Sequence, residues 1–213
     1  MNPTLSAKLD RLLSLVLDAN QTMNLTAVTD AEEARVRHIE DSRSLLSCAD
    51  FQGRKVLDIG SGAGFPGLVL KIFEPSIDLT LIDSTSKKVD FLRFAVNELG
   101  LADVCCVHGR AELYGRTKAR ESFDLVTARG VAFLPVLLEL CLPLVKVGGT
   151  FLAMKETPLE PCPAARFGGE PQPPKKAQLS NGIIHYVIPV TKITPTPPQY
   201  PRTWAAMVKR PVV

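Results

Sequence analysis

The sequence VLDIGSGAGFPGLVL, residues 56–70, joins a short apolar run to a glycine-rich turn. Two patterns overlap in it, G-x-G-x-G from Gly60 and G-x-G-x-x-G from Gly62. The apolar run predicts a strand, and Pro66 stands where a helix can begin, because the first turn does not need its missing N–H. Glycines let the backbone approach a ligand closely, and a helix N-terminus offers free N–H groups to an anion. This strand, turn and helix therefore predict a cofactor site.

Strand and helix patterns alternate on both sides of this turn, from Lys55 to Lys155. Apolar runs that suit buried strands are separated by segments with helical spacing. Such alternation predicts a parallel sheet with helices on both faces. The expected strands are KVLDIG (55–60), LTLID (79–83), VCCVHG (104–109), FDLVTAR (123–129) and TFLAMK (150–155), and the expected helices span about 66–73, 86–99 and 134–144.

The N-terminal segment is predicted to form two helices. Leu9, Leu12 and Val16 follow the period of an amphipathic helix, and Asp30 is a suitable N-cap for a second helix that ends near Cys48.

Prolines concentrate near the other end, where eleven of the seventeen lie between Pro158 and Pro201. There IIHYVIPV (183–190) predicts a strand, and TWAAMVKR (203–210) is a candidate for the last one. FGGEPQPPKKAQLSNG (167–182) is expected to be a loop, because Pro and Gly interrupt any regular pattern.

Composition indicates a globular protein. Of 213 residues 46% are apolar and 22% charged, which suits one main domain. No apolar run is long enough for a membrane helix, and the N-terminal stretch lacks the cleavage site of a signal peptide. Five scattered cysteines, an odd number, are expected to be reduced thiols. We therefore expect a cytoplasmic protein with no membrane anchor.

Charge is distributed unevenly, although the net charge is only +3. From Met154 onward there are eight Lys or Arg residues and three acidic ones. A basic segment near an active site suits a polyanionic partner, because phosphate contacts release counterions. A solvated surface without a partner would show the same pattern, so charge alone does not decide between the two interpretations.

An acidic residue at the end of the second expected strand predicts a nucleoside. Asp83 follows Gly60 by twenty-three residues and can accept hydrogen bonds from ribose hydroxyls. The alternative is a loop aspartate that caps the helix at Ser86. NAD and S-adenosylmethionine both meet these requirements. Asp58 before the glycines, and HGRAE (108–112) after the third strand, favour S-adenosylmethionine.

Nine segments stand in an order and spacing typical of one protein family. They are NLTAVTD (24–30), RHIEDS (37–42), DIGSGAGFPG (58–67), LIDSTSKKVDFLR (81–93), ELGL (98–101), VHGRAE (107–112), ARGVA (128–132), GGTFLAMKE (148–156) and TPPQYPR (196–202). Over nearly its whole length the sequence resembles the bacterial small-subunit ribosomal RNA guanine-N7 methyltransferase G family, also called glucose-inhibited division protein B. The FPG, AMK and YPR segments are the most selective.

The resemblance implies a Rossmann-like class I S-adenosylmethionine-dependent methyltransferase, an α/β fold with a seven-stranded, mostly parallel sheet. Residues 1–50 would form a helical extension, and 51–213 the methyltransferase domain. The target would be N7 of one guanine in the 530 loop of 16S ribosomal RNA. The cofactor residues expected from the resemblance and the glycine loop are Asp58, Gly60, Gly62, Gly64, Phe65, Asp83, Ser84, Ala111, Glu112 and Arg129.

The same resemblance makes Lys155 and Arg202 candidates for RNA contact. After Arg202 the sequence departs from the family, because 203–206 replace a further basic residue and a Gly-x-Pro stretch. RNA contacts beyond this point are left open. We also expect a monomer.

The chemistry at N7 is simple, because its in-plane lone pair can attack a methyl group without prior loss of a proton. We therefore expect no general base, and catalysis mainly by alignment of donor and acceptor. Arg129 is expected to position a phosphate or base edge. Two alternatives stay open, an RNA-binding module that has lost catalysis and a methyltransferase that acts on a small molecule.

The cysteines have simpler interpretations. Cys162 follows a proline, as a covalent cytosine methyltransferase would require, but it lies in the proline-rich segment and is an improbable nucleophile. The remaining cysteines on apolar stretches, Cys105, Cys106 and Cys141, are expected in the core.

Three histidines without metal-ligand spacing predict no zinc site. His38 is expected to anchor the N-terminal helices through a hydrogen bond, with Asp41 as a candidate partner. Trp204 is expected either to stack on an unpaired base or to pack on the final strand.

Overall fold

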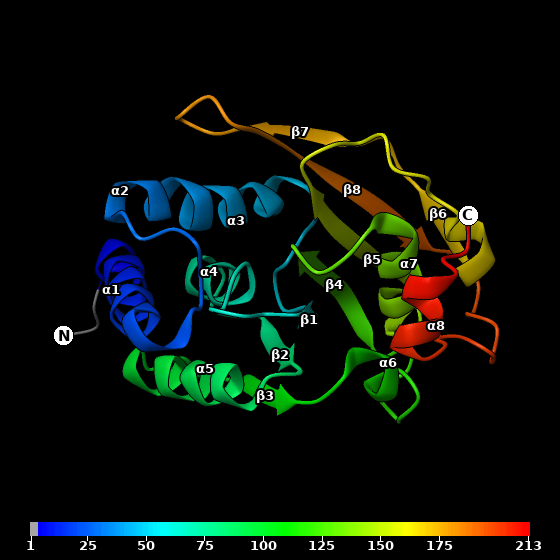
Figure 1. The fold of residues 1–213 in the computed structure, drawn as a ribbon, viewed down its shortest axis with the longest axis horizontal. Helices are drawn as coiled ribbons and strands as arrows, with labels where there is room; N and C mark the ends of the chain where they lie inside the picture. Colours follow the sequence, from blue (N-terminus) through cyan, green and yellow to red (C-terminus); the bar gives the residue numbers. More distant parts are fainter. Residues whose placement is uncertain (1–3) are drawn as a thin grey trace.

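One twisted sheet crosses the protein, whose computed structural model describes residues 4–213 (Figure 1). Its strands are β1 Lys55–Ile59, β2 Asp78–Asp83, β3 Val104–His108, β4 Phe123–Arg129, β5 Val145–Lys155, β6 Gly169–Pro171, β7 Lys175–Gln178 and β8 Ile184–Lys192. Their order is β3-β2-β1-β4-β5-β8-β6, and β7 pairs with β8. Strands β1 to β5 are parallel, and β8 is antiparallel to its three neighbours. The predicted α/β class is confirmed.

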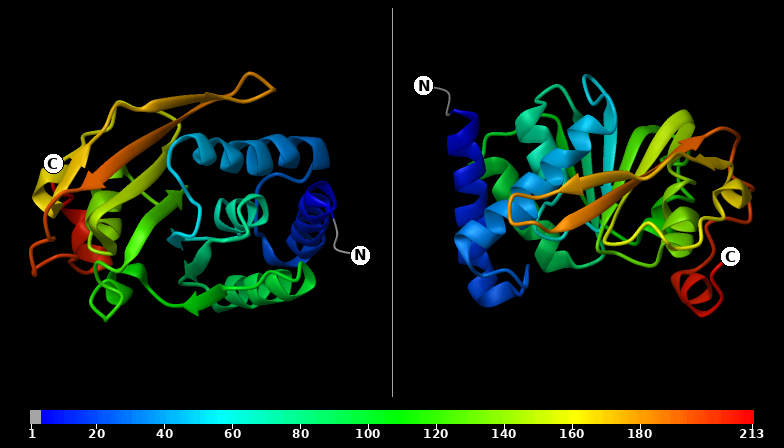
Figure 2. Two further views of the ribbon diagram at one scale, coloured as in Figure 1. Left: turned by 180° about the vertical axis from the view of Figure 1, so that it is seen from behind. Right: turned by 90° about the horizontal axis from the view of Figure 1, so that it is seen from above.

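Helices cover both faces of this sheet, as Figures 1 and 2 show. They are α1 Leu5–Met23, α2 Ala31–Ala34, α3 Asp41–Ser44, α4 Gly67–Phe73, α5 Ser86–Glu98, α6 Ala111–Tyr114, α7 Leu134–Cys141 and α8 Trp204–Lys209, with a π-helix at Arg35–Glu40 and 3-10 turns at Leu45–Ser47 and Ala164–Phe167. Buried apolar residues of α1, α4 and α5 belong to one cluster, and those of α6, α7 and α8 to another. Alternate strand residues supply the two clusters, as a sheet buried on both faces requires.

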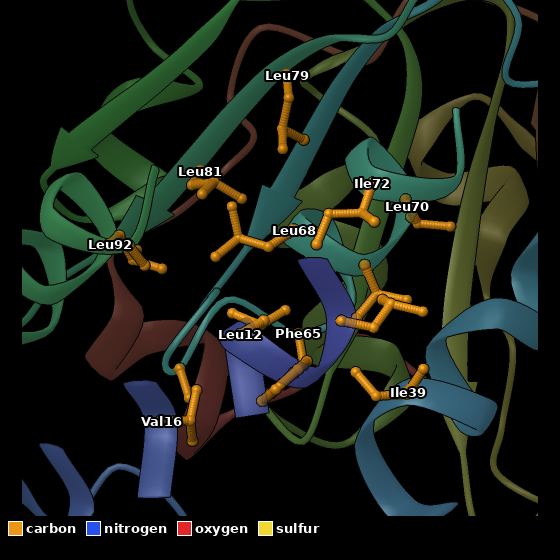
Figure 3. Packing of buried hydrophobic residues seen from close by; sticks show 14 of the residues in the cluster. Leu12, Val16, Ile39, Phe65, Leu68, Leu70, Ile72, Leu79, Leu81 and Leu92 are labelled. Carbon is orange, nitrogen blue, oxygen red and sulfur yellow. The ribbon is translucent and has the colours of Figure 1, made fainter. Parts of the chain in front are cut away.

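Helix α1 packs on α4 and α5, the helices that cover one face of the sheet, and Figure 3 shows side chains of this shared cluster. Leu12 and Val16 of α1 are fully buried in one cluster with Leu68 of α4, Leu81 of β2 and Leu92 of α5. Burial of a leucine or valine side chain contributes about 1.5–3 kcal/mol. The first fifty residues therefore share a core with the sheet.

The second N-terminal helix begins where the sequence predicted. The Asp30 carboxylate accepts a hydrogen bond from the backbone N–H of Glu33 at 2.8 Å. From Arg35 to Glu40 the helix widens into π geometry, which inserts an extra residue into the turn and is frequent at functional sites. This local widening sets the positions of His38 and Asp41, which both contact Arg129 at the carboxyl end of β4.

Two predictions for the C-terminal part are wrong. The sheet has eight strands instead of seven, because residues 167–182 form β6 and β7 and not a continuous loop. β7 and β8 make an antiparallel hairpin in which Lys175 is opposite Val187, and its turn contains Gly182 at φ +84°. The long strand β8 satisfies the backbone groups of these short polar strands, which compensates for their weak propensity.

The segment 203–210 forms helix α8 and not a last strand. The Thr203 hydroxyl accepts a hydrogen bond from the N–H of Ala206 at 3.4 Å, which caps the helix. Ala205 and Ala206 favour a helix, and Met207 is fully buried against the sheet. The cap, the two alanines and a single buried residue, Met207, outweigh the short alternation that suggested a strand.

Gly67 lets helix α4 approach strand β2 closely. A Cβ atom at Gly67 would lie 2.4 Å from Leu81 Cδ2 and 3.0 Å from Asp58 Oδ2, so one of these side chains would have to move. We expect Gly67→Ala to lower the free energy of unfolding by about 1–3 kcal/mol, the usual cost of overpacking. Gly109→Ala is the control, because nothing lies within 4 Å of its added Cβ. Equal denaturant midpoints for the two variants would contradict this packing.

Candidate functional site

The glycine loop after β1 has a backbone that only glycine adopts easily. Gly60, Gly62 and Gly64 have φ of +67°, +56° and +94°. The loop is held by the Gly64 N–H, which donates to Ser61 O at 2.7 Å, and by the Gly62 N–H, which donates to Asp83 Oδ2 at 3.1 Å. A Cβ at Gly60 would lie 2.6 Å from Val131 Cγ2, so this loop and the turn after β4 are in contact.

A first cavity of about 210 Å³ opens at the carboxyl ends of β1 and β2. This is where ligands bind in open parallel sheets, because the strand order reverses beside β1. The cavity is smaller than the roughly 300 Å³ or more of a typical ligand site, so it suits part of a cofactor. Five of the predicted cofactor residues line it: Gly60, Asp83, Ser84, Ala111 and Glu112.

Asp83 is buried at the rim of this first cavity. Its Oδ1 accepts from the Thr85 N–H at 2.8 Å and its Oδ2 from the Gly62 N–H at 3.1 Å. A carboxylate has about four acceptor positions, so each oxygen can accept one further hydrogen bond. Asp83 therefore organises the loop and still offers acceptors to a bound hydroxyl.

Glu112 is the second buried acid of the first cavity, with 7% of its surface exposed. Its Oε1 accepts from Arg110 Nε at 3.0 Å. Within residues 4–213, no hydrogen bond to Oε2 is formed. Since no side-chain oxygen that is itself buried lacks a hydrogen-bond partner in this range, Oε2 is accessible at the cavity and can accept from an N–H group of a ligand.

Asp58 lies beneath the glycine loop and does not line the first cavity. Its Oδ1 accepts from Thr127 Oγ1 at 2.8 Å and its Oδ2 from the Gly67 N–H at 3.2 Å. Complete burial raises the pKa of Asp58 to about 6, and these hydrogen bonds oppose that effect. Asp58 thus joins β1 to β4 and to the first turn of α4.

A second cavity of about 680 Å³ lies beside the first, at the carboxyl ends of β4 and β5. The turn after β4 separates the two, because Val131 lines the first cavity and its neighbour Gly130 lines the second. Arg129 and Lys155 line the second cavity. The structure thus places these two predicted residues together, but outside the first cavity.

Arg129 is held in the second cavity by three acceptors. Its Nη1 donates to Asp41 Oδ2 at 3.0 Å and to the Arg37 carbonyl at 2.9 Å, and its Nη2 approaches His38 Nδ1 at 3.3 Å. The guanidinium carbon also lies 5.5 Å from the ring centroid of Phe65, in the glycine loop. Arg129 therefore connects the loop, the N-terminal helices and the second cavity.

His38 anchors the N-terminal helices as predicted, but through a different partner. Its Nε2 lies 2.9 Å from Thr26 Oγ1, and its ring stacks on Phe65 with centroids 4.5 Å apart. The predicted bond to Asp41 is wrong, because that carboxylate binds Arg129 and His185 Nδ1. Burial, and then the nearby Arg129 charge, lower the pKa of His38 to about 4. The neutral ring can thus accept from Arg129 and donate to the threonine.

A comparison with known proteins decides the family. Residues 5–164 match the family model described as rRNA small subunit methyltransferase G. The chain belongs to this family. It is 44% identical over 215 residues to "Ribosomal RNA small subunit methyltransferase G" of Geobacillus kaustophilus, covering 97% of this chain and 90% of that protein. The relative of the same name from Moorella thermoacetica is 42% identical, with 100% and 92% covered.

Membership in the methyltransferase G family makes this chain an S-adenosylmethionine-dependent methyltransferase, which agrees with its fold. A SAM-dependent methyltransferase from Aquifex aeolicus has a similar structure, with a TM-score of 0.54, 17% identity, and 75% of this chain and 93% of that chain covered. TrmN from Thermus thermophilus has a TM-score of 0.55 and 22% identity, with 71% and 48% covered. These likenesses concern the fold.

The two residues predicted to contact RNA have different surroundings in this methyltransferase. Lys155 lies in the second cavity, where its Nζ pairs with Glu160 Oε1 at 2.7 Å and donates to the Ala132 carbonyl at 3.0 Å. Arg202 lies in neither cavity, and its guanidinium forks onto the buried carboxylate of Glu139. Lys155 therefore lines a cavity, whereas Arg202 anchors the chain to α7, and the RNA contacts of both residues stay predictions.

The cysteine predictions hold in part. Cys141 is buried, but Cys105 is exposed because β3 is an edge strand, so its expected place in the core is wrong. Cys162 lines neither cavity, and partial burial raises the pKa of its thiol, which opposes thiolate formation.

Two negative findings concern residues 4–213. No group of three or more His, Cys, Asp or Glu residues there could hold a metal ion. None of the helices in this range is long and apolar enough to span a membrane.

Sequence reasoning missed Asp41 as the residue that joins β4 to β8. It is 1% exposed and binds Arg129 with one oxygen and His185 with the other. The motif RHIEDS marked this acid, but only the tertiary structure brings His185 of β8 to it.

Proposed function

We propose that this chain transfers a methyl group from S-adenosylmethionine to N7 of a guanine in the 530 loop of 16S ribosomal RNA. The observation that carries the proposal is a pair of neighbouring cavities that share the segment 129–131. Val131 lines the first cavity, and Arg129 and Gly130 line the second. One has the acceptors that a nucleoside needs, and the other is larger and contains cationic side chains. A donor and an acceptor bound on the two sides would meet at this turn.

The residues of the first cavity fit the cofactor. The positive-φ loop at Gly60, Gly62 and Gly64 leaves its backbone free of side chains for the amino-acid end, with Ser84 at the rim. Asp83 has acceptor positions for the ribose hydroxyls. Glu112, with Ala111, offers Oε2 to the amino group of adenine. In this arrangement Asp58 supports the loop from beneath, and Phe65, within the loop, stacks on His38.

The reaction needs little from the protein beyond alignment. S-adenosylmethionine supplies a methyl group activated by its sulfonium centre. The bond from carbon to sulfur breaks as the bond to N7 forms, and the positive charge passes to the purine. N7 loses no proton, so no side chain has to act as a base. Holding the groups in line can contribute on the order of 7 kcal/mol or more.

Arg129 positions the acceptor in this scheme. Its side chain is 21% exposed, charged, and fixed by Asp41, so it can bind a phosphate or the O6 edge of guanine. Lys155, beside it in the same cavity, is placed for an RNA phosphate. The proposal includes action as a monomer, in the cytoplasm where the RNA substrate is found.

Methyl transfer to small ribosomal subunits tests the function directly. Purified protein, tritiated S-adenosylmethionine and subunits from cells that lack this gene should give incorporation into 16S RNA. Borohydride reduction and aniline cleavage should map it to one guanine of the 530 loop. A transcript with 7-deazaguanosine has no N7 and should accept nothing. Label in metabolites, or in another RNA position, would refute the proposal.

Replacing the positioning arginine should separate acceptor binding from cofactor binding. We expect Arg129→Ala to reduce kcat/KM for the RNA substrate by at least about tenfold, as for one lost charge-assisted hydrogen bond. The affinity for S-adenosylmethionine should change little, because Arg129 is outside the first cavity. Arg93→Ala, an exposed arginine of α5, is the matched control. An Arg129→Ala protein with near wild-type transfer would contradict this role.

A further inference from the structure

Helix α8 brings an aromatic residue to the first cavity. Trp204 is half-buried and lines this cavity together with Ile82, Ala111 and Leu140, on the side where Glu112 lies. Gly60 of the glycine loop and Asp83 belong to the same lining. Of the described residues in this lining, Trp204 is the one aromatic residue, and it lies near Glu112 because Arg110 contacts both.

The position of this indole is fixed by anchors on both sides of it. Two contacts hold the chain just before Trp204. Arg202 donates from Nε and Nη2 to the two carboxylate oxygens of Glu139. Arg116 Nε donates to the Pro201 carbonyl at 2.9 Å. Three residues further along α8, Met207 is fully buried. Arg202 Nη2 also donates to the Arg210 carbonyl at 3.0 Å, which closes the helix at its far end. Trp204 is therefore a rigid wall and not part of a loose tail.

The indole is also coupled to the buried acid of the cavity. The Arg110 guanidinium carbon lies 5.2 Å from the Trp204 ring centroid, within cation–π range, and Arg110 Nε donates to Glu112 Oε1. One side chain thus contacts both the aromatic wall and the carboxylate. Arg110 holds Glu112 by one oxygen, which leaves Oε2 for a ligand.

We propose that Trp204 is a specificity-determining residue of the cofactor site and forms the aromatic wall against which the adenine ring binds. The proposal rests on the proposed function, since it needs a cofactor nucleoside in the first cavity. A flat purine gains from contact with a flat aromatic surface in a way that an aliphatic side chain does not reproduce. Glu112 would recognise the adenine amino group, and Trp204 would recognise the ring itself.

The chain contains a single tryptophan, so its intrinsic fluorescence reports on this wall alone. Titration of the wild-type protein with S-adenosylhomocysteine should change the emission, with the same midpoint as calorimetry. Adenosine should change it in the same direction at higher concentration. Methionine should leave it unchanged. Calorimetric binding of S-adenosylhomocysteine without any change in fluorescence would overturn the role of Trp204 and leave the proposed function standing.

Variants give an independent measurement. We expect Trp204→Ala to raise the Kd for S-adenosylhomocysteine about tenfold, in the lower part of the range for a stacked base, and Trp204→Phe to restore most of the affinity. Val208→Ala, an exposed position of the same helix, is the matched control. Equal affinity of Trp204→Ala and wild type would overturn the proposal. Failure of the wild-type protein itself to bind S-adenosylhomocysteine would instead refute the proposed function and this inference together.

Discussion

Asp83→Ala is expected to weaken S-adenosylmethionine binding by at least about a hundredfold, because hydrogen bonds to a charged acceptor contribute about 1.5–3 kcal/mol each and a ribose offers two hydroxyls. The substitution also leaves the N–H groups of Gly62 and Thr85 without their acceptor. The glycine loop would lose the contact that joins it to β2. Calorimetry with S-adenosylmethionine, together with the shift in melting temperature at saturating ligand, measures the loss.

The matched control for this variant is Asp78→Ala. Asp78 is an exposed acid at the other end of the same strand, so it changes the net charge equally and lies away from the cavity. It should bind S-adenosylmethionine like the wild type. If Asp83→Ala bound the cofactor with undiminished affinity while folding normally, the nucleoside would not lie across the end of β2, and the assignment of the first cavity would fail.

The sequence predicts this part of the molecule well for a physical reason. Buried parallel strands are continuous apolar runs, and the residues that follow them lie at one edge of the sheet. Three residues of the first cavity stand at or shortly after the end of such a run: Gly60, Asp83 and Glu112. Their meeting in one cavity could therefore be predicted from the sequence alone. Arg129 also ends a strand, but it lines the second cavity. The reason is that β4 lies between β1 and β5, on the other side of β1 from β2.

The C-terminal region was less predictable because its strands depend on a neighbour. β7 contains KKAQ, which has no strand preference of its own and is ordered by pairing with β8. The same hairpin carries His185 to Asp41, and Ser180 Oγ donates to Glu40 Oε2 at 2.7 Å. These contacts join segments about 140 residues apart in the chain. No local pattern contains that information, whereas α8 could have been recognised from its Thr203 cap.

Two buried ionisable groups should give stability profiles of opposite sign between about pH 4 and 6.5. The pKa of His38 is about 4 in the folded protein against an ordinary value of 6.5, so the unfolded chain binds more protons in this window and acidification destabilises the fold. The pKa of Asp58 is about 6 against 3.8, so the folded protein binds more protons and acidification stabilises it. In the wild type the two effects nearly cancel.

Non-titrating replacements should reveal each effect separately. Relative to wild type, His38→Gln should gain about 2–3 kcal/mol of unfolding free energy between pH 7 and pH 4, because it no longer takes up a proton on unfolding. Asp58→Asn should lose a similar amount over the same interval. Its Oδ1 can still accept from Thr127, while the loss of the bond from Gly67 adds a cost that does not depend on pH. Urea unfolding at half-unit pH steps measures both curves.

The double variant distinguishes two independent groups from one coupled network. If His38 and Asp58 act separately, the difference between the double variant and wild type should be nearly constant with pH, because the two slopes cancel. Both groups sense the charge of Arg129, which opposes protonation of each. A double variant whose pH dependence departs from the sum of the two single-variant curves would show coupling through that arginine. Two single variants with flat difference curves would instead mean that neither group is buried as described.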